Sequence, residues 1–127
     1  VDIIETEGLV ERSVKMGEYM LKQARQRLMP HPTVGDIRGK GLIMGVELVR
    51  NKATKEPFAP SVMAAARVNR LAMERGCMVF PTTGTVEGVA GDVIIMAPPY
   101  IITESQIDDG LDMVDAALTD FEKEFLK

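Results

Sequence analysis

The stretch RGKGLIMG, residues 38–45, is the first candidate for chemistry because it places a lysine between two glycines. Such a loop binds phosphate when the pattern GxxxxGK is followed by Ser or Thr and by a helix whose N-terminus faces the anion. Here Lys40 is followed by Gly41 and an apolar stretch typical of a strand. The glycine spacing also differs from that of a dinucleotide-binding loop. We therefore expect a hairpin turn at Gly39-Lys40, where glycine supplies a positive φ, and no phosphate site.

A cysteine nucleophile or a zinc centre is the second possibility. The chain has one cysteine, Cys77, and one histidine, His31. Cys77 precedes an apolar run, which favours a small core residue, and His31 lies between prolines in a loop that we expect to be exposed. A nucleophilic cysteine needs a histidine partner, and the only histidine is in this loop. A zinc site needs more Cys and His side chains than the chain has, so we predict neither kind of site. A single cysteine excludes an internal disulfide and fits a reducing, cytoplasmic compartment without proving one.

Lysines and carboxylates are the remaining candidates. A Schiff-base lysine must be desolvated so that its amine is neutral. None of the seven lysines meets this condition, because they lie on expected polar surfaces, at the C-terminus or in a turn. Glu47 is the single charge in an apolar strand, and Arg38 across the hairpin is its candidate partner. For this pair, a structural salt bridge or an exposed edge is favoured over a catalytic role. Because the lysines, Cys77 and His31 also offer no catalytic arrangement, we expect that the chain by itself is not a complete enzyme.

Three amphipathic helices are expected to position these residues. In residues 9–29 an apolar face recurs at steps of four and three, formed by Val10, Val14, Gly17, Leu21, Ala24 and Leu28. Gly17 is expected to mark a close approach to another element. Ser61 is expected to cap a helix that runs to Arg75. The last helix begins with a capping box, Thr103 with Gln106.

This last helix has an apolar and an acidic face. The apolar face consists of Ile107, Leu111, Val114, Leu118, Phe121 and Phe125. We expect its aspartates to form a solvated face, not a metal site; they are Asp108, Asp109, Asp112, Asp115 and Asp120.

Strands are expected at residues 37–38, 42–50 and 77–81 and in the uncharged stretch after Asp92, with residues 82–92 as a glycine-rich loop. We expect residues 42–50 to be buried on both faces, with Glu47 as the exception. Short strands between helices predict an α/β fold, an α+β small domain with a three- to four-stranded, mostly antiparallel sheet packed against helices. The length of 127 residues suggests one domain. The net charge of −4 and the scattered basic residues give no surface for nucleic acid or a membrane.

Three stretches together resemble a known family: VGDIRGKGLIMGVELVRNKATKEPF (residues 34–58), ERGCMVFP (residues 74–81) and GDVIIMAPPYIIT (residues 91–103). In order and spacing they are similar to the C-terminal small domain of class III aminotransferases, pyridoxal-phosphate enzymes of fold type I. The resemblance covers essentially the whole chain. The motif residues that carry it are Arg38, Gly39, Gly41, Glu47, Pro98 and Pro99.

The resemblance implies that the functional groups of the parent enzyme are distributed over a large and a small domain. Residues 1–8 would be the tail of the helix that leaves the large domain, and residues 9–127 would be the small domain. The Schiff-base lysine, the aspartate that pairs with the pyridine nitrogen and most phosphate-binding groups belong to the large domain of the family. Pyridoxal 5'-phosphate would therefore bind there, and the parent enzyme would be a homodimer. The isolated chain is expected to be inactive and to bind the cofactor weakly or not at all.

The resemblance also implies where substrate would lie. Ornithine-type members carry an arginine two residues before APP that holds the α-carboxylate of the substrate; here this position is Ile95. Some amine:pyruvate members carry a mobile arginine at the position of Gly88. Together with Phe80 and Tyr100, these are the candidate pocket residues, although Ile95 is equally explained as a core residue and Tyr100 is favoured as an interface residue.

These candidate pocket residues are apolar and include no arginine, so the resemblance points to the ω-amine:pyruvate branch of the family. Members of this branch transfer the amino group to a keto acid such as pyruvate. Two alternatives stay open at this point, a stand-alone binding module and a separate subunit of a split enzyme.

Overall fold

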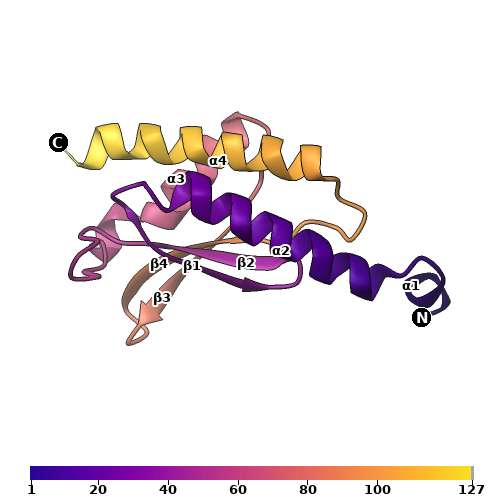
Figure 1. The fold of residues 1–127 in the computed structure, drawn as a ribbon. Coiled ribbons are helices and arrows are strands. Elements are labelled where there is room, and N and C mark those ends of the chain that lie inside the picture. The colour runs from indigo at the N-terminus through magenta and orange to yellow at the C-terminus, as the bar shows by residue number, and fades with distance from the viewer. Residues whose placement is uncertain (127) are drawn as a thin grey trace.

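The chain folds into one antiparallel sheet whose main helices lie on the same face (Figure 1). The structure is a computed structural model, and it describes residues 1–126. The strand order is β1-β2-β4-β3, and each neighbouring pair is antiparallel. The elements are α1 Asp2–Thr6, α2 Leu9–Leu28, β1 Val34–Lys40, β2 Ile43–Leu48, η1 Pro60–Val62, α3 Ala64–Glu74, β3 Phe80–Val86, β4 Ala90–Met96 and α4 Glu104–Phe125. The predicted α/β fold with a small antiparallel sheet is confirmed.

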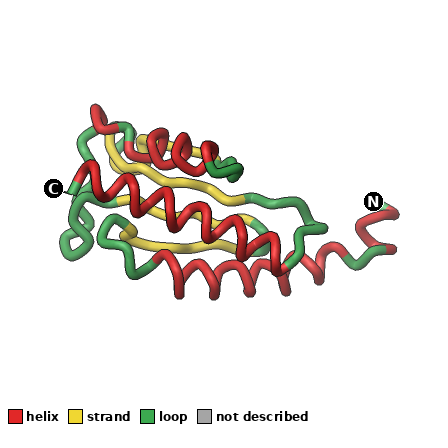
Figure 2. Tube along the Cα trace, turned by 90° about the horizontal axis from the view of Figure 1, so that it is seen from above, coloured by secondary structure: helices red, strands yellow, loops and turns green. Residues whose placement is uncertain are grey.

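The two faces of the sheet differ in what covers them. Figure 2, seen from the helix side, shows α2, α3 and α4 in front of the strands. In β2 the side chains alternate, so that Met44 and Val46 are buried under the helices and Ile43 on the other face is 63% exposed. The prediction that residues 42–50 would be buried on both faces is therefore wrong. Among residues 1–126, no helix is both long and apolar enough to cross a membrane.

The turn between β1 and β2 lies two residues later than predicted. β1 continues through Lys40, and Gly41 with Leu42 forms the turn. Gly41 has the positive φ of +55° that favours glycine. Gly39 instead allows β1 and β2 to approach closely, because a Cβ there would lie 2.5 Å from the carbonyl oxygen of Ile43.

Helix α2 buries only the C-terminal part of the face that was predicted. Gly17, Ala24 and Leu28 are buried as expected, but Val10 and Val14 are more than half exposed. The buried set is Leu9, Met16, Gly17, Met20, Ala24 and Leu28. The predicted and buried sets share Gly17, Ala24 and Leu28 and differ toward the N-terminus, where Leu9, Met16 and Met20 are buried and the two valines are exposed.

Helix α3 begins with a cap that comes from a strand. Ser61 does not cap it, because residues 60–62 form a 3-10 turn and α3 starts after Met63, which has a left-handed backbone. The Oδ1 atom of Asp92 in β4 accepts a hydrogen bond from the backbone N–H of Ala65 at 2.9 Å. Asp92 is buried, and burial raises the pKa of its carboxyl although the bond from Ala65 lowers it. The helix is thus capped through a tertiary contact, which local sequence does not reveal.

Strands β3 and β4 form a hairpin where we predicted a loop at residues 82–92. The glycines of this segment have positive φ and serve a bulge and the hairpin turn, so they do not interrupt the pairing. The segment 77–81 is not the predicted buried strand, because β3 begins at Phe80 and the Phe80 side chain is 67% exposed.

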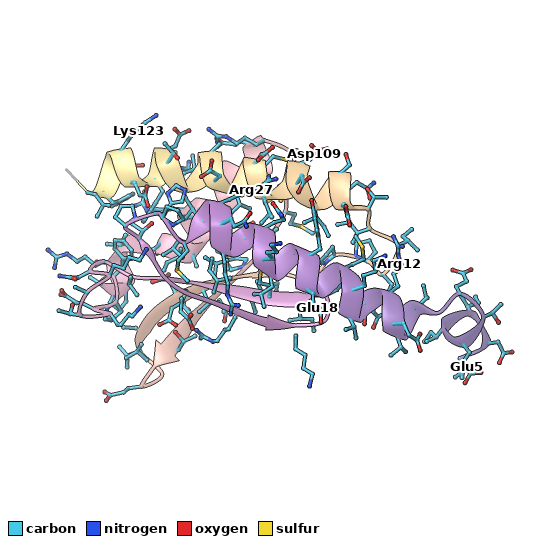
Figure 3. All side chains as sticks on the ribbon, in the orientation of Figure 1. Glu5, Arg12, Glu18, Arg27, Asp109 and Lys123 are labelled. Carbon is cyan, nitrogen blue, oxygen red and sulfur yellow. The ribbon has the colours of Figure 1, made fainter. Side chains whose placement is uncertain are left out.

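Helix α4 has the predicted apolar face and capping box, but its aspartates do not all face solvent. The Thr103 side chain accepts from the backbone of Gln106, and the Gln106 side chain accepts from the backbone of Thr103. Arg27 of α2 lies between the two helices (Figure 3) and forms salt bridges with Asp108 and Asp112 at 3.1 and 2.7 Å. Part of the acidic face is therefore the interface between α2 and α4.

Candidate functional site

The face of the sheet without helices brings two predicted pocket residues together. Phe80 of β3 pairs with Ile95 of β4, and Ile95 pairs with Gly45 of β2. Directly paired residues point to the same face of a sheet, so Phe80 and Ile95 share the open face. Ile95 stays half-buried, while Phe80 is largely exposed. The result is an apolar surface at the β3–β4 side of the sheet.

A charged cluster occupies the β1 side of the same face. The Nη1 atom of Arg38 lies 2.8 Å from Glu47 Oε2 and 2.9 Å from Asp36 Oδ2. The hydrogen bonds to Glu47 and then to Asp36 raise the pKa of the guanidinium. The predicted pairing of Arg38 with Glu47 across the hairpin is confirmed. Because two carboxylates already engage this arginine, it is poorly suited to hold a substrate carboxylate.

Tyr100 lies in the turn that joins β4 to α4. Pro98 and Pro99 follow the strand, and neither can donate a ladder hydrogen bond, which ends the pairing. The Tyr100 side chain is 51% exposed. Arg12 of α2 lies beside this turn (Figure 3) and donates to its backbone carbonyls.

Gly88 lies apart from the other candidates. It is at the tip of the β3–β4 hairpin, with a φ of +73°. β4 runs from Ala90 beside this tip to Met96 beside the Tyr100 turn. At about 3.3 Å per residue, the strand separates the two ends by roughly 20 Å. The structure therefore groups Ile95, Phe80 and the Tyr100 turn at one end of the strand, and Gly88 at the other.

A cleft of about 410 Å³ lies on the helix side of the β4 end. Its lining is mostly apolar and includes Cys77, Met78, Met96, Pro98 and Met113. Cys77 is half-buried, not a full core residue, and burial raises the pKa of its thiol. A raised pKa disfavours the thiolate form, so the cleft does not hold an activated nucleophile.

His31 is buried and paired, contrary to the expectation of an exposed loop residue. It is only 9% exposed, and its ring nitrogens lie 2.6 Å from Asp115 Oδ1 and 2.9 Å from Glu122 Oε2. Burial opposes its charge, but the hydrogen bonds to Glu122 and Asp115 prevail and raise the pKa of the imidazole. A neutral imidazole has a single N–H, so bonds to two carboxylates favour the charged form. His31 joins the α2–β1 loop to α4 and lies away from the open face.

The residues present do not fit pyridoxal phosphate. A Schiff-base lysine must be desolvated, but five of the six lysines within residues 1–126 are exposed. The sixth, Lys52, is half-buried and donates to the backbone carbonyls of Met29 and His31. Within the same residues, His, Cys, Asp and Glu form no group of three suited to a metal ion.

Sequence reasoning missed three polar residues that the fold uses: Arg12, His31 and Asp92. Arg12 fell outside the predicted apolar face of α2, which was misplaced near the N-terminus, where Val10 and Val14 are exposed. A signal was present for His31, because Asp115 and Glu122 share one face of the last helix at a spacing of seven. Asp92 had no local signal, since its partner is 27 residues away.

Comparisons with known proteins agree with this geometry. The model of the family "Aminotransferase class-III" matches residues 1–118. A taurine–pyruvate aminotransferase of Bilophila wadsworthia is 37% identical over 125 residues, which cover 98% of this chain and 27% of the relative. An uncharacterized aminotransferase of Schizosaccharomyces pombe is 41% identical over 117 residues, covering 92% of this chain and 26% of the relative. The chain belongs to the class III aminotransferase family.

Solved structures show the same similarity. A transaminase from the marine bacterium Virgibacillus superposes with a TM-score of 0.89 at 31% identity, over 97% of this chain and 27% of that one. A Bacillus anthracis aminotransferase gives a TM-score of 0.84 at 37% identity, over 94% and 26%. The chain thus spans about a quarter of the length of the relatives it matches.

Proposed function

We propose that this chain is the C-terminal small domain of a pyridoxal-phosphate-dependent class III aminotransferase. The family match over residues 1–118 and the coverage of about a quarter of each relative support this assignment. In this proposal residues 1–8 lead from the large domain, and residues 9–127 form the small domain. The large domain holds the cofactor, which supplies the electron sink for amino transfer. The parent would be a homodimer.

The role of this chain is to provide part of the substrate-side wall. The open face offers Ile95 beside an exposed Phe80, and the described residues that follow Arg75 include no arginine. A planar carboxylate is best held by a bidentate guanidinium, which this wall lacks. The isolated chain would also be inactive, because none of its described lysines is desolvated.

The parent enzyme would use a donor whose amine is distant from any carboxylate, with a keto acid such as pyruvate as acceptor. The observation that carries this proposal is the isoleucine at position 95, on an apolar face, where ornithine-type members have an arginine. The similarity to a taurine–pyruvate aminotransferase supports the same branch, since taurine has no carboxylate.

Steady-state kinetics of the full-length enzyme test the proposal. With pyruvate as acceptor, we expect kcat/KM for an ω-amino donor such as taurine to exceed that for an α-amino donor such as L-2-aminobutyrate, whose one amine is next to its carboxylate. An Ile95→Arg variant should raise kcat/KM for the α-amino donor at least about tenfold, because a charge-assisted bond to its carboxylate is worth about 1.5–3 kcal/mol. Ile95→Leu is the matched control and should leave the preference unchanged. A wild-type enzyme that prefers α-amino donors would contradict the assignment.

A further inference from the structure

Arg12 makes an unusual set of contacts for a residue near the start of a helix. Its Nε atom donates to the carbonyl oxygen of Tyr100 at 2.8 Å, and its Nη2 atom donates to those of Ile101 and Ile102 at 3.3 and 2.6 Å. The three acceptors are consecutive in the chain and about 90 residues away from Arg12. One guanidinium therefore binds the whole backbone of the turn that leads into α4.

The turn depends on these bonds for its attachment to α2. Its internal support is one hydrogen bond, from the N–H of Ile102 to the carbonyl of Pro99 at 3.0 Å. The side chains of Tyr100 and Ile101 are 51% and 69% exposed, so they contribute little packing to hold the turn. Because two prolines precede the turn, its backbone has few other donors to offer. Arg12 thus provides the polar attachment of the turn to α2, beside the packing of the partly buried Ile102 against the core.

The residue type suits this task. Three carbonyl groups converge on one side chain, and a guanidinium offers several N–H donors in a fixed plane. A lysine ammonium at the same position would be a point donor on a flexible stem, and it could not keep the spacing of three acceptors. Arg12 is half-buried, which strengthens charge-assisted bonds relative to full exposure.

We propose that Arg12 is a positioning residue, which fixes the Tyr100–Ile101 turn so that the Tyr100 ring limits the size of the amine donor. The inference rests on the proposed function, because it requires the Tyr100 turn to border the substrate pocket. Ile95 lies five residues before Tyr100 on the strand that leads into this turn. Arg12 itself does not touch the donor in this proposal; it acts through the backbone of the turn.

The test compares a bulky and a small amine donor in the full-length enzyme. We measure the ratio of kcat/KM for 1-phenylethylamine to that for ethylamine, with pyruvate as acceptor. This ratio does not depend on how much of a variant is folded. Arg12→Ala should raise the ratio about tenfold, a size that pocket shape commonly produces. Arg12→Lys should behave like Arg12→Ala.

Arg25→Ala is the matched control, because Arg25 lies on the same helix and donates to one carbonyl, that of Ile37. It should leave the ratio within about twofold of wild type. In a double-mutant cycle, Arg12→Ala should have little further effect on the ratio once Tyr100→Ala has removed the ring. An equal change for both donors in Arg12→Ala, or an undiminished shift in the Tyr100→Ala background, would overturn the proposal.

Hydrogen exchange separates this proposal from the proposed function. In Arg12→Ala, but not in Arg25→Ala, the amides of residues 100–106 should exchange at least about tenfold faster, because the turn has lost its attachment. Unchanged exchange would overturn the positioning role. If exchange rises but the wild-type enzyme transfers no amino group from any amine, the attachment stands, and both the proposed function and the substrate role of Arg12 fail.

Discussion

At the scale of single residues, the contact that joins distant parts of the chain most directly is that of His31. Its imidazole bridges Asp115 and Glu122, which lie two turns apart on α4. Thr33 donates from its hydroxyl group to the other oxygen of Glu122, so this carboxylate is satisfied on both sides. Lys52 donates to the backbone carbonyl of His31 at 3.2 Å. The loop between α2 and β1 is therefore attached to α4 through charge as well as packing.

This attachment predicts a dependence of stability on pH. The folded pKa of His31 is raised above the unfolded value of about 6.5, because Glu122 and Asp115 bind the charged form. The contribution to the free energy of unfolding is then fully present below pH 6.5 and is lost as the pH rises through the folded pKa. Urea unfolding of the chain between pH 6 and pH 9 should show this decline.

Two variants distinguish titration from packing. His31→Gln should be less stable than wild type at pH 6, and the difference should shrink toward pH 9. Thr33→Val removes the hydroxyl bond to Glu122 but no titratable group. It should lose about 1 kcal/mol, the value of a typical hydrogen bond, and keep the pH dependence. A constant difference between wild type and His31→Gln over this range would show that folding does not raise the pKa of the imidazole, which contradicts its binding by the two carboxylates in the charged form.

At the scale of elements, helices with one clear apolar stripe were predicted well and the others were not. α4 has its six apolar positions and both capping residues where the sequence places them. Near its N-terminus α2 offers apolar residues on more than one side, and only tertiary contact decides which are buried, so Val10 and Val14 were assigned to the wrong side. The start of α3 and the β3–β4 hairpin depend on Asp92 and on a bulge, both tertiary features. The candidate site was predicted only in part for the same reason. Ile95 and Phe80 were named from the sequence, but that they are paired neighbours follows only from the register of β3 and β4.

Two glycines inside helices give a matched test of these packing arguments. Gly17 of α2 faces the β1–β2 turn, and a Cβ there would lie 2.0 Å from the carbonyl oxygen of Gly41. A Cβ on Gly110 of α4 would meet Cys77 Sγ and Met96 Cε at 4.0 Å, which is ordinary contact. Gly110→Ala should therefore raise the free energy of unfolding by about 0.5–1 kcal/mol through helix propensity. Gly17→Ala should lower it by about 1–3 kcal/mol through overpacking.

Urea unfolding of both variants measures these effects, and each variant serves as the control for the other. Propensity alone would stabilise both, so opposite signs identify the close approach of α2 to the turn as the cause. A stabilised Gly17→Ala would show that α2 and Gly41 separate without cost, which contradicts the close packing described here.

At the scale of the whole molecule, the sheet is covered on one face only. α2, α3 and α4 lie on one side of the sheet and bury the core there (Figure 1). On the other side Phe80 and Ile43 remain exposed. Helix α1 extends beyond the sheet and buries none of its residues. Gly8, with a φ of +58°, separates it from α2. An exposed sheet face and an unpacked α1 are what the proposed small-domain role requires, because another part of the parent would cover them in that role.

This arrangement predicts how the 127-residue chain behaves with pyridoxal phosphate and an amine donor. Borohydride reduction followed by mass spectrometry should find no stoichiometric modification of a single lysine, because the described lysines are exposed or bound to backbone carbonyls. Weak labelling spread over several exposed lysines is expected instead, and Lys40→Arg should leave its total nearly unchanged. Pyruvate should not be converted to alanine. A single reduced imine with turnover would mean that this chain carries the reactive amine itself, and the assignment of the cofactor site to another domain would fail.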